Sequence, residues 1–187
     1  KKSLKSGVFG YKHWFFDNWD ALVSSEDTLF LVIFRNPVNW LSSLNKTPFH
    51  CSSSLHNLPF SDFIRTEWCC IWDEVANVDK SNPKFGTEMM HERDPSTGMR
   101  FSNVLELRKS KLSNWLKMAS YTTNIAYLSY EELLKSPESY LSSVLESFNV
   151  PVKDFKNINS YRGFGKKVYI PKPDPVISVS DSDFICK

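Results

Sequence analysis

The stretch LFLVIFRNPVNWLSSL, residues 29 to 44, predicts a strand that leads directly into a helix. Its first six residues are apolar and include Val32 and Ile33, which is typical of a strand covered on both faces in a parallel sheet. Pro37 ends this strand and presets the first turn of a helix that runs to about Leu44. The order of strand, arginine and helix places Arg35 at the edge of a sheet.

Strands and helices alternate along the rest of the chain. Hydrophobic periodicity and turn signals predict strands over 7–11 and 125–129, and helices over 61–72, 103–119 and 136–148. The helix over 103–119 is expected to bury Leu105, Leu112, Trp115, Leu116 and Ala119, and to carry Arg108, Lys109 and Lys111 among its polar positions. The alternation is typical of an α/β fold with a parallel central sheet flanked by helices.

Length and composition predict one ordinary domain over residues 1–187. The polar residues 77–100 are expected to form an exposed insertion, and residues 166–187 an extended tail. The net charge is +2 and the basic residues are scattered, so a nucleic-acid partner is not expected. No apolar run approaches the length of a transmembrane helix. A soluble, cytoplasmic protein is the default expectation, although the compartment is unknown.

The four cysteines and four histidines do not suggest a metal site. The cysteines lack C-x-x-C spacing and are expected to be plain thiols, and His50, His56 and His91 lie in polar loops. We therefore expect no metal.

Polar side chains follow each predicted strand at its carboxyl end, where parallel sheets bind ligands. Arg35 could bind a phosphate through its planar fork, and Ser43, two turns into the following helix, could add its hydroxyl, with nearby backbone N–H groups helping. The alternative is that Arg35 pairs with a surface carboxylate and that Ser43 is an ordinary helix-surface residue.

These residues also resemble the motifs of sulfotransferases. LVIFRNPVNWLSSL is similar to the family's segment for the 3'-phosphate of 3'-phosphoadenosine-5'-phosphosulfate, with Arg35 and Ser43 at the binding positions. Tyr11-Lys12-His13 resembles the segment with the catalytic histidine, at the separation from the arginine that the family has. AYLSYEELLKSPESYL resembles the strand whose tyrosine, here Tyr130, lies by the adenine. YRGFGK resembles a late loop that returns to the 3'-phosphate, which implies a binding role for Arg162 and Gly163.

The resemblance implies a P-loop NTPase-like fold and an enzyme that transfers a sulfuryl group to a hydroxyl or amine of a small-molecule or glycan acceptor. His13 would be the general base and Lys12 the nearby cation that balances charge on the leaving oxygen. The family also has a Pro-Lys-Ser-Gly-Thr-like loop for the 5'-phosphosulfate. LKSGVFG at 4–10 imitates that loop but lies too close to His13, so we expect the loop either to lie upstream or to be absent.

Two other functions remain open at this stage. One is a P-loop phosphotransferase, which would need a magnesium carboxylate at a strand end and an intact phosphate loop. The other is a non-catalytic module of the same fold that binds a nucleotide or a protein.

Overall fold

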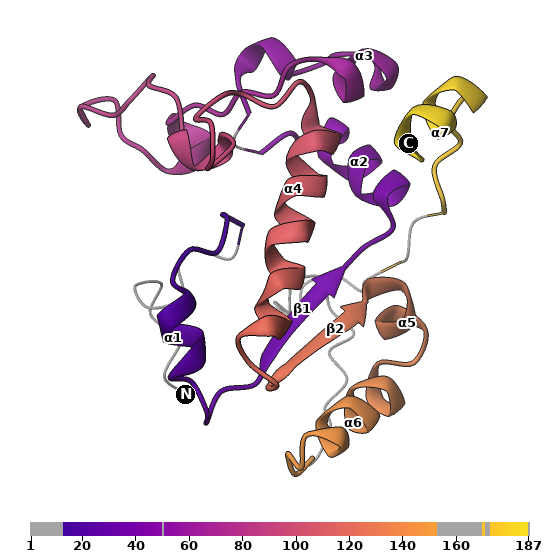
Figure 1. Cartoon of the computed structure of the whole chain (residues 1–187). Coiled ribbons are helices and arrows are strands. Elements are labelled where there is room, and N and C mark those ends of the chain that lie inside the picture. The colour runs from indigo at the N-terminus through magenta and orange to yellow at the C-terminus, as the bar shows by residue number, and fades with distance from the viewer. Residues whose placement is uncertain (1–12, 50, 153–169, 171–172, 187) are drawn as a thin grey trace.

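The apolar run at 29–34 forms strand β1 (Phe30–Phe34), which pairs in parallel with β2 (Ile125–Ser129). The computed structural model describes residues 13–49, 51–152, 170 and 173–186. The two strands are joined by a long crossover that contains α2, α3 and α4 (Figure 1). The prediction of an α/β domain with parallel strands is confirmed for these two strands. The strand predicted over 7–11 lies outside the described residues.

The helices agree with most of the predicted segments. In chain order the α-helices are α1 (Trp19–Val23), α2 (Pro37–Lys46), α3 (Phe60–Arg65), α4 (Val104–Leu116), α5 (Tyr130–Lys135), α6 (Pro137–Ser147) and α7 (Val179–Ile185). Short 3-10 helices cover Ser53–Leu55, Glu74–Ala76, Met90–Glu92 and Lys117–Ser120. Asn36 and Asn103 cap α2 and α4 by accepting hydrogen bonds from N–H groups of the first turn, as short polar side chains commonly do.

The two faces of the sheet differ in how they are covered. On one face Phe30, Val32 and Ile125 pack, together with Trp115 of α4, against a buried cluster of Phe16, Leu22 and Met118. In Figure 1 the lower end of α4 lies over the beginning of β1. On the other face Leu31 and Ile33 remain 43% and 47% exposed. The expectation that this strand is covered on both faces is therefore wrong, because the described residues cover only one face of β1.

The buried face of α4 agrees only in part with the predicted one, since Leu105 and Trp115 pack against the cores as expected. Val104, Leu107 and Lys111 are buried, whereas Leu116 is 51% exposed. At about 100° per residue, the true face lies roughly a quarter turn from the predicted apolar stripe. The difference arises because Lys111 is neutralised by Glu92, with Nζ to Oε1 and Oε2 distances of 2.7 and 2.8 Å.

The helix predicted over 61–72 ends at Arg65, and the chain then becomes extended. Trp68 N–H donates to the Phe101 carbonyl and Trp72 N–H donates to the Thr87 carbonyl. The extended segment after α3 thus forms backbone hydrogen bonds with residues 87 and 101, in and just after the 77–100 region. Ile71 and Glu88 form an isolated antiparallel bridge. The 77–100 region is mostly exposed, but Met89 is buried in the core.

The C-terminal segment is not wholly extended, as was predicted for residues 166–187. Val179–Ile185 forms α7, capped by Ser178. Arg65 of α3 holds this helix through an ion pair with Asp181 and lies 4.5 Å from the Phe184 ring centroid. The prediction is wrong for these residues because a buried carboxylate and an aromatic ring give the segment a tertiary anchor.

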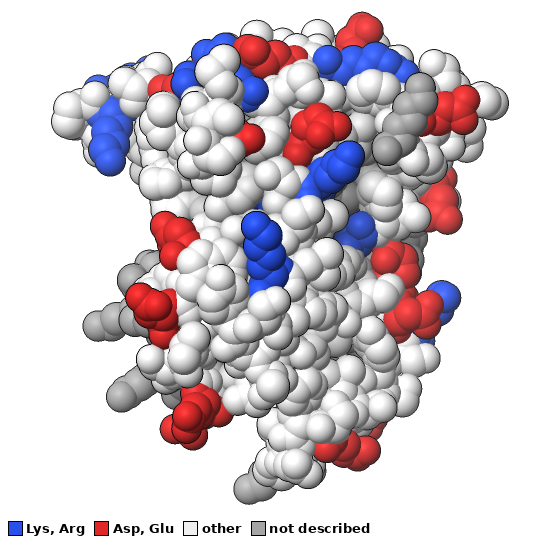
Figure 2. Space-filling model, viewed as in Figure 1, with Lys and Arg blue, Asp and Glu red and all other residues white. Residues whose placement is uncertain are grey.

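The main core lies between α2, α3, α4 and the extended segment after α3. It is built on Leu41, Leu55, Phe63, Ile64 and Leu107, each at most 4% exposed. On the face in Figure 2, Lys and Arg side chains are mixed with Asp and Glu in the upper part, and the acidic groups near the lower edge are separated by uncharged surface, so no continuous patch of one sign forms. Among the described residues no helix is both long enough and apolar enough to span a bilayer.

Candidate functional site

Arg35 and Tyr130 lie side by side at the carboxyl edge of the two strands. The parallel register pairs Phe34 with Ser129, so the next residue of each chain segment leaves the sheet at the same place. The Arg35 guanidinium carbon lies 5.0 Å from the Tyr130 ring centroid, within the range of a cation–π contact. Arg35 Nε is buried and has no hydrogen-bond partner in the structure. The sheet thus holds a cation with an unused donor at this edge.

The backbone N–H groups at the start of α2 are already occupied. Asn36 Oδ1 accepts hydrogen bonds from Val38 N–H at 2.9 Å and from Asn39 N–H at 3.3 Å. The N–H of Asn36 donates to Glu131 Oε1 at 2.9 Å. The expectation that these N–H groups help to hold a phosphate is therefore wrong in this structure. An anion at this edge would therefore have to bind to side chains such as Arg35, and the carboxylate of Glu131 lies at the same edge.

Ser43 lies on α2 about two turns from the sheet edge, as predicted, and its side chain is exposed. Trp40, one turn earlier on the same helix, is half-buried. Asn39 Nδ2 donates to Asp174 Oδ1 at 2.8 Å, so the chain that leads to α7 passes along this helix. Arg35 and Ser43 thus lie at opposite ends of the first two turns of α2, and their convergence on one phosphate stays a prediction.

His13 is exposed and lies beside α4, as the contacts of the next residue show. The Trp14 carbonyl accepts a hydrogen bond from Trp115 Nε1 at 3.3 Å, and the Trp14 ring stacks on His91 with centroids 4.0 Å apart. The predicted residues Lys12, Arg162 and Gly163 lie outside the described residues. The structure thus brings Arg35 and Tyr130 into contact and places His13 along a different element.

Arg108 is a residue that the sequence interpretation treated only as a polar helix position. Its guanidinium carbon lies 4.9 Å from the Trp40 ring centroid and 5.4 Å from that of Trp115. Burial lowers the pKa of Arg108 from its ordinary value. Trp115 also donates the hydrogen bond to the carbonyl of Trp14, the residue after His13. Arg108 therefore lies between that segment and α2. The two-turn spacing of Arg108 and Trp115 was the available signal, since residues seven apart share a helix face.

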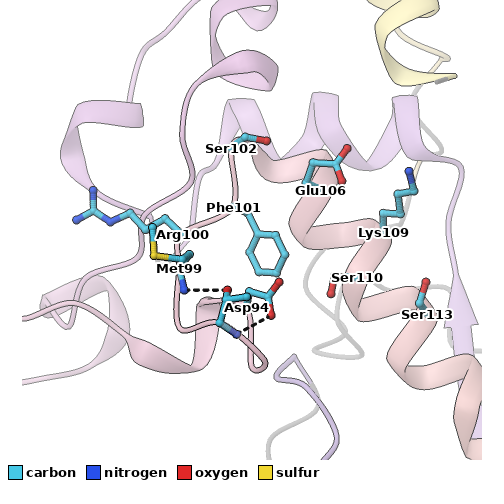
Figure 3. Close-up of a pocket in the computed structure, with 10 residues that line it drawn as sticks. Asp94, Met99, Arg100, Phe101, Ser102, Glu106, Lys109, Ser110 and Ser113 are labelled. Atoms are coloured by element: carbon cyan, nitrogen blue, oxygen red, sulfur yellow. Dashed lines mark hydrogen bonds between the residues drawn. The ribbon is translucent and has the colours of Figure 1, made fainter.

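A shallow pocket of about 440 Å³ opens on the opposite face of α4 (Figure 3). It is lined by Asp94, Thr97, Met99, Arg100, Phe101, Ser102, Glu106, Lys109, Ser110 and Ser113. Its charges are balanced, and Arg100 is engaged by Glu67 and Glu88. Because Arg108 is roughly 200° around the helix from Glu106, this pocket is separated from α2 by α4 itself.

Several other titratable groups form ion pairs or lie in the core. Arg93 and Arg100 donate to the Glu88 carboxylate and lower its pKa from 4.5 to about 2. Burial raises the pKa of the Cys51 thiol to about 12 and raises that of Cys70. These two thiols are poor nucleophiles at neutral pH. All four cysteines are free thiols, and the described side chains include no cluster of three or more metal-ligating groups.

No family model, no curated protein and no solved structure matches this chain. The functional interpretation therefore rests on the residues and geometry described above.

Proposed function

We propose that this domain binds 3'-phosphoadenosine-5'-phosphosulfate and transfers its sulfuryl group to a hydroxyl or amine of a small-molecule or glycan acceptor. The observation that carries the proposal is the contact between Arg35 and Tyr130 at the edge of a parallel strand pair. A cation and an aromatic ring, each at the start of a helix, suit a ligand that combines a phosphate with a planar base. A P-loop NTPase-like sheet is part of the same proposal.

Arg35 and Ser43 would bind the 3'-phosphate. The Arg35 guanidinium has a buried Nε without an acceptor, and stacking on Tyr130 fixes the plane of its fork. Ser43 offers an exposed hydroxyl two turns along the helix that begins at this edge. Because the Glu131 carboxylate accepts from the Asn36 N–H and so occupies the start of α2, the phosphate would bind to Arg35 rather than to the helix N-terminus. Tyr130 would lie against the adenine.

His13 would be the general base, because an imidazole titrates near neutral pH. It would accept the proton of the acceptor hydroxyl as that oxygen forms a bond to sulfur and the bond from sulfur to the 5'-phosphate oxygen breaks. The donor supplies the activated sulfuryl group, and adenosine 3',5'-bisphosphate leaves. Lys12 remains the proposed cation near the leaving oxygen.

Calorimetry with adenosine 3',5'-bisphosphate tests nucleotide binding. Arg35→Ala should weaken binding at least about tenfold, the effect of losing a charged hydrogen-bond donor to phosphate. Lys46→Ala is the matched control, because Lys46 is an exposed cation in the last turn of the same helix. The control should bind as the unmodified chain does. Absence of binding by the unmodified chain would remove this proposal.

Transfer of labelled sulfate tests the catalytic assignment. His13→Ala should abolish transfer and leave the affinity for the bisphosphate within about twofold of the unmodified chain, because the base does not bind the nucleotide. Equal turnover by this variant would refute the role of His13. Nucleotide binding without transfer would favour the non-catalytic module instead.

A further inference from the structure

In the part of the chain that the structure describes, Arg108 differs from three of the other four arginines in forming no ion pair with a carboxylate. Five arginines belong to the described residues, and three of them, Arg65, Arg93 and Arg100, form ion pairs with carboxylates. Within that part of the chain, Arg35 and Arg108 form none, and both stack on aromatic rings. Arg35 and Arg108 therefore both lie against aromatic rings without a carboxylate partner among the described residues. Arg35 is the residue proposed above to bind phosphate.

The two aromatic rings that Arg108 contacts accept no conventional hydrogen bond from its guanidinium. Trp40 and Trp115 attract the cation through their rings but offer no acceptor to its five N–H donors. The side chain is half-buried, and burial lowers its pKa without any carboxylate to raise it again. A desolvated cation is costly unless an anion balances it. Lys111 on the same helix, by contrast, forms an ion pair with Glu92 that balances its charge.

The position of Arg108 relates it to Ser43. Arg108 packs on Trp40 of α2, and Trp40 and Ser43 are three residues apart, so they are neighbours on the surface of that helix. The cation thus lies against the side of α2 on which the Ser43 hydroxyl is exposed. Trp40 N–H donates to the Asn36 carbonyl, so this side begins one turn from the sheet edge that carries Arg35.

We propose that Arg108 is a second anion-binding arginine of this site and that, with Ser43, it binds the 3'-phosphate of the nucleotide. This inference rests on the proposed function, because it takes the ligand from it. The two tryptophans act as stacking surfaces that orient the planar guanidinium, so that its fork presents two parallel donors to phosphate oxygens. Arg35 and Arg108 would then approach the phosphate from the sheet edge and from α4.

The test is calorimetry of the 187-residue chain with two probes, adenosine 3',5'-bisphosphate and adenosine 5'-monophosphate. Arg108→Met, which keeps an apolar stem between the tryptophans, should weaken bisphosphate binding at least about tenfold. It should change binding of the monophosphate, which lacks the 3'-phosphate, by less than about twofold. The losses caused by Arg108→Met and Ser43→Ala should be non-additive in the double variant, because both residues contact one group.

Lys109→Met is the matched control, since Lys109 is the next residue of α4 and lines the pocket on the far face. It should bind both nucleotides as the unmodified chain does. Arg108→Gln, which keeps a planar polar group but no charge, should show the same tenfold loss and replaces the methionine variant if that variant does not fold.

The outcomes separate this inference from the proposed function. Bisphosphate affinity that is unchanged by Arg108→Met or Arg108→Gln, but lost in Arg35→Ala, would overturn the role of Arg108 and leave nucleotide binding in place. Equal losses for both nucleotides would also overturn it, because the 3'-phosphate would not be the group bound. No binding by the unmodified chain would overturn both proposals.

Discussion

Removing one partner of the buried Lys111–Glu92 ion pair should destabilise this domain strongly. The Lys111 Nζ lies 2.7 and 2.8 Å from the two Glu92 carboxylate oxygens, and the side chains are only 8% and 11% exposed. Lys111→Met would leave the Glu92 carboxylate buried without its cation. Loss of one partner of a buried pair costs about 3 to 5 kcal/mol, and we expect about 3 kcal/mol here because both side chains keep a little contact with solvent.

Urea denaturation with extrapolation to water measures this loss of unfolding free energy. Glu92→Met should be destabilising to a similar degree, because it leaves the Lys111 ammonium group unpaired. The double variant Lys111→Met, Glu92→Met should lie within about 1 kcal/mol of the unmodified protein, since a well-packed apolar pair often replaces a buried ion pair without loss.

Lys135→Met is the matched control for burial. Lys135 Nζ lies 2.8 Å from Glu132 Oε1, nearly the distance of the buried pair, but these side chains are 69% and 54% exposed. The control should leave the urea midpoint unchanged, because solvent screens an exposed pair. The reasoning would be refuted if the single variants at the buried pair were as stable as this control, or if their effects were additive in the double variant.

Two further predictions concern the titratable groups. Because the pKa of Glu88 is about 2 in the folded protein and 4.5 otherwise, its ion pairs should stabilise the fold above pH 4.5, and this contribution should be lost as the pH falls towards about 2. The unfolding free energies of Glu88→Gln and the unmodified protein, measured by urea denaturation, should therefore differ at neutral pH by about 1 to 2 kcal/mol, a figure reduced for the partial exposure of Arg100, and should converge in acid. A gap that persists in acid would contradict this assignment. N-ethylmaleimide at neutral pH should modify the exposed Cys186 and spare Cys51, which is 1% exposed and has a pKa of about 12, whereas both should react in urea. Mass spectrometry that finds Cys51 modified as fast as Cys186 in the folded protein would count against the buried position of this thiol.

Local sequence signals were sufficient for β1 and β2 and for the starts of α2, α3, α4 and α6 to within one residue. The apolar run before Arg35 and the proline after it predicted β1 and α2, because a proline cannot continue a ladder and favours the first turn of a helix. The placement of Arg35 and Tyr130 at one sheet edge was also predictable, since parallel strands end on the same side.

The face of α4 could be predicted only in part from hydrophobic periodicity. Lys111 and Arg108 occupy its inner side, and whether a cation can be there depends on groups far away in the chain. The same holds for the end of α3, where the extended residues that follow pair with the 77–100 region, and for α7, which Arg65 holds against α3.

The sequence by itself determined the alternation of strand and helix, the start of α2 at Pro37 and the residue types at the strand ends, because these depend on neighbouring residues. Only the tertiary structure decided which cations are buried, which of them have a counter-charge and which side of α4 meets α2. Burial and pairing arise between residues distant in the chain, and no local pattern encodes the charge that a distant segment brings.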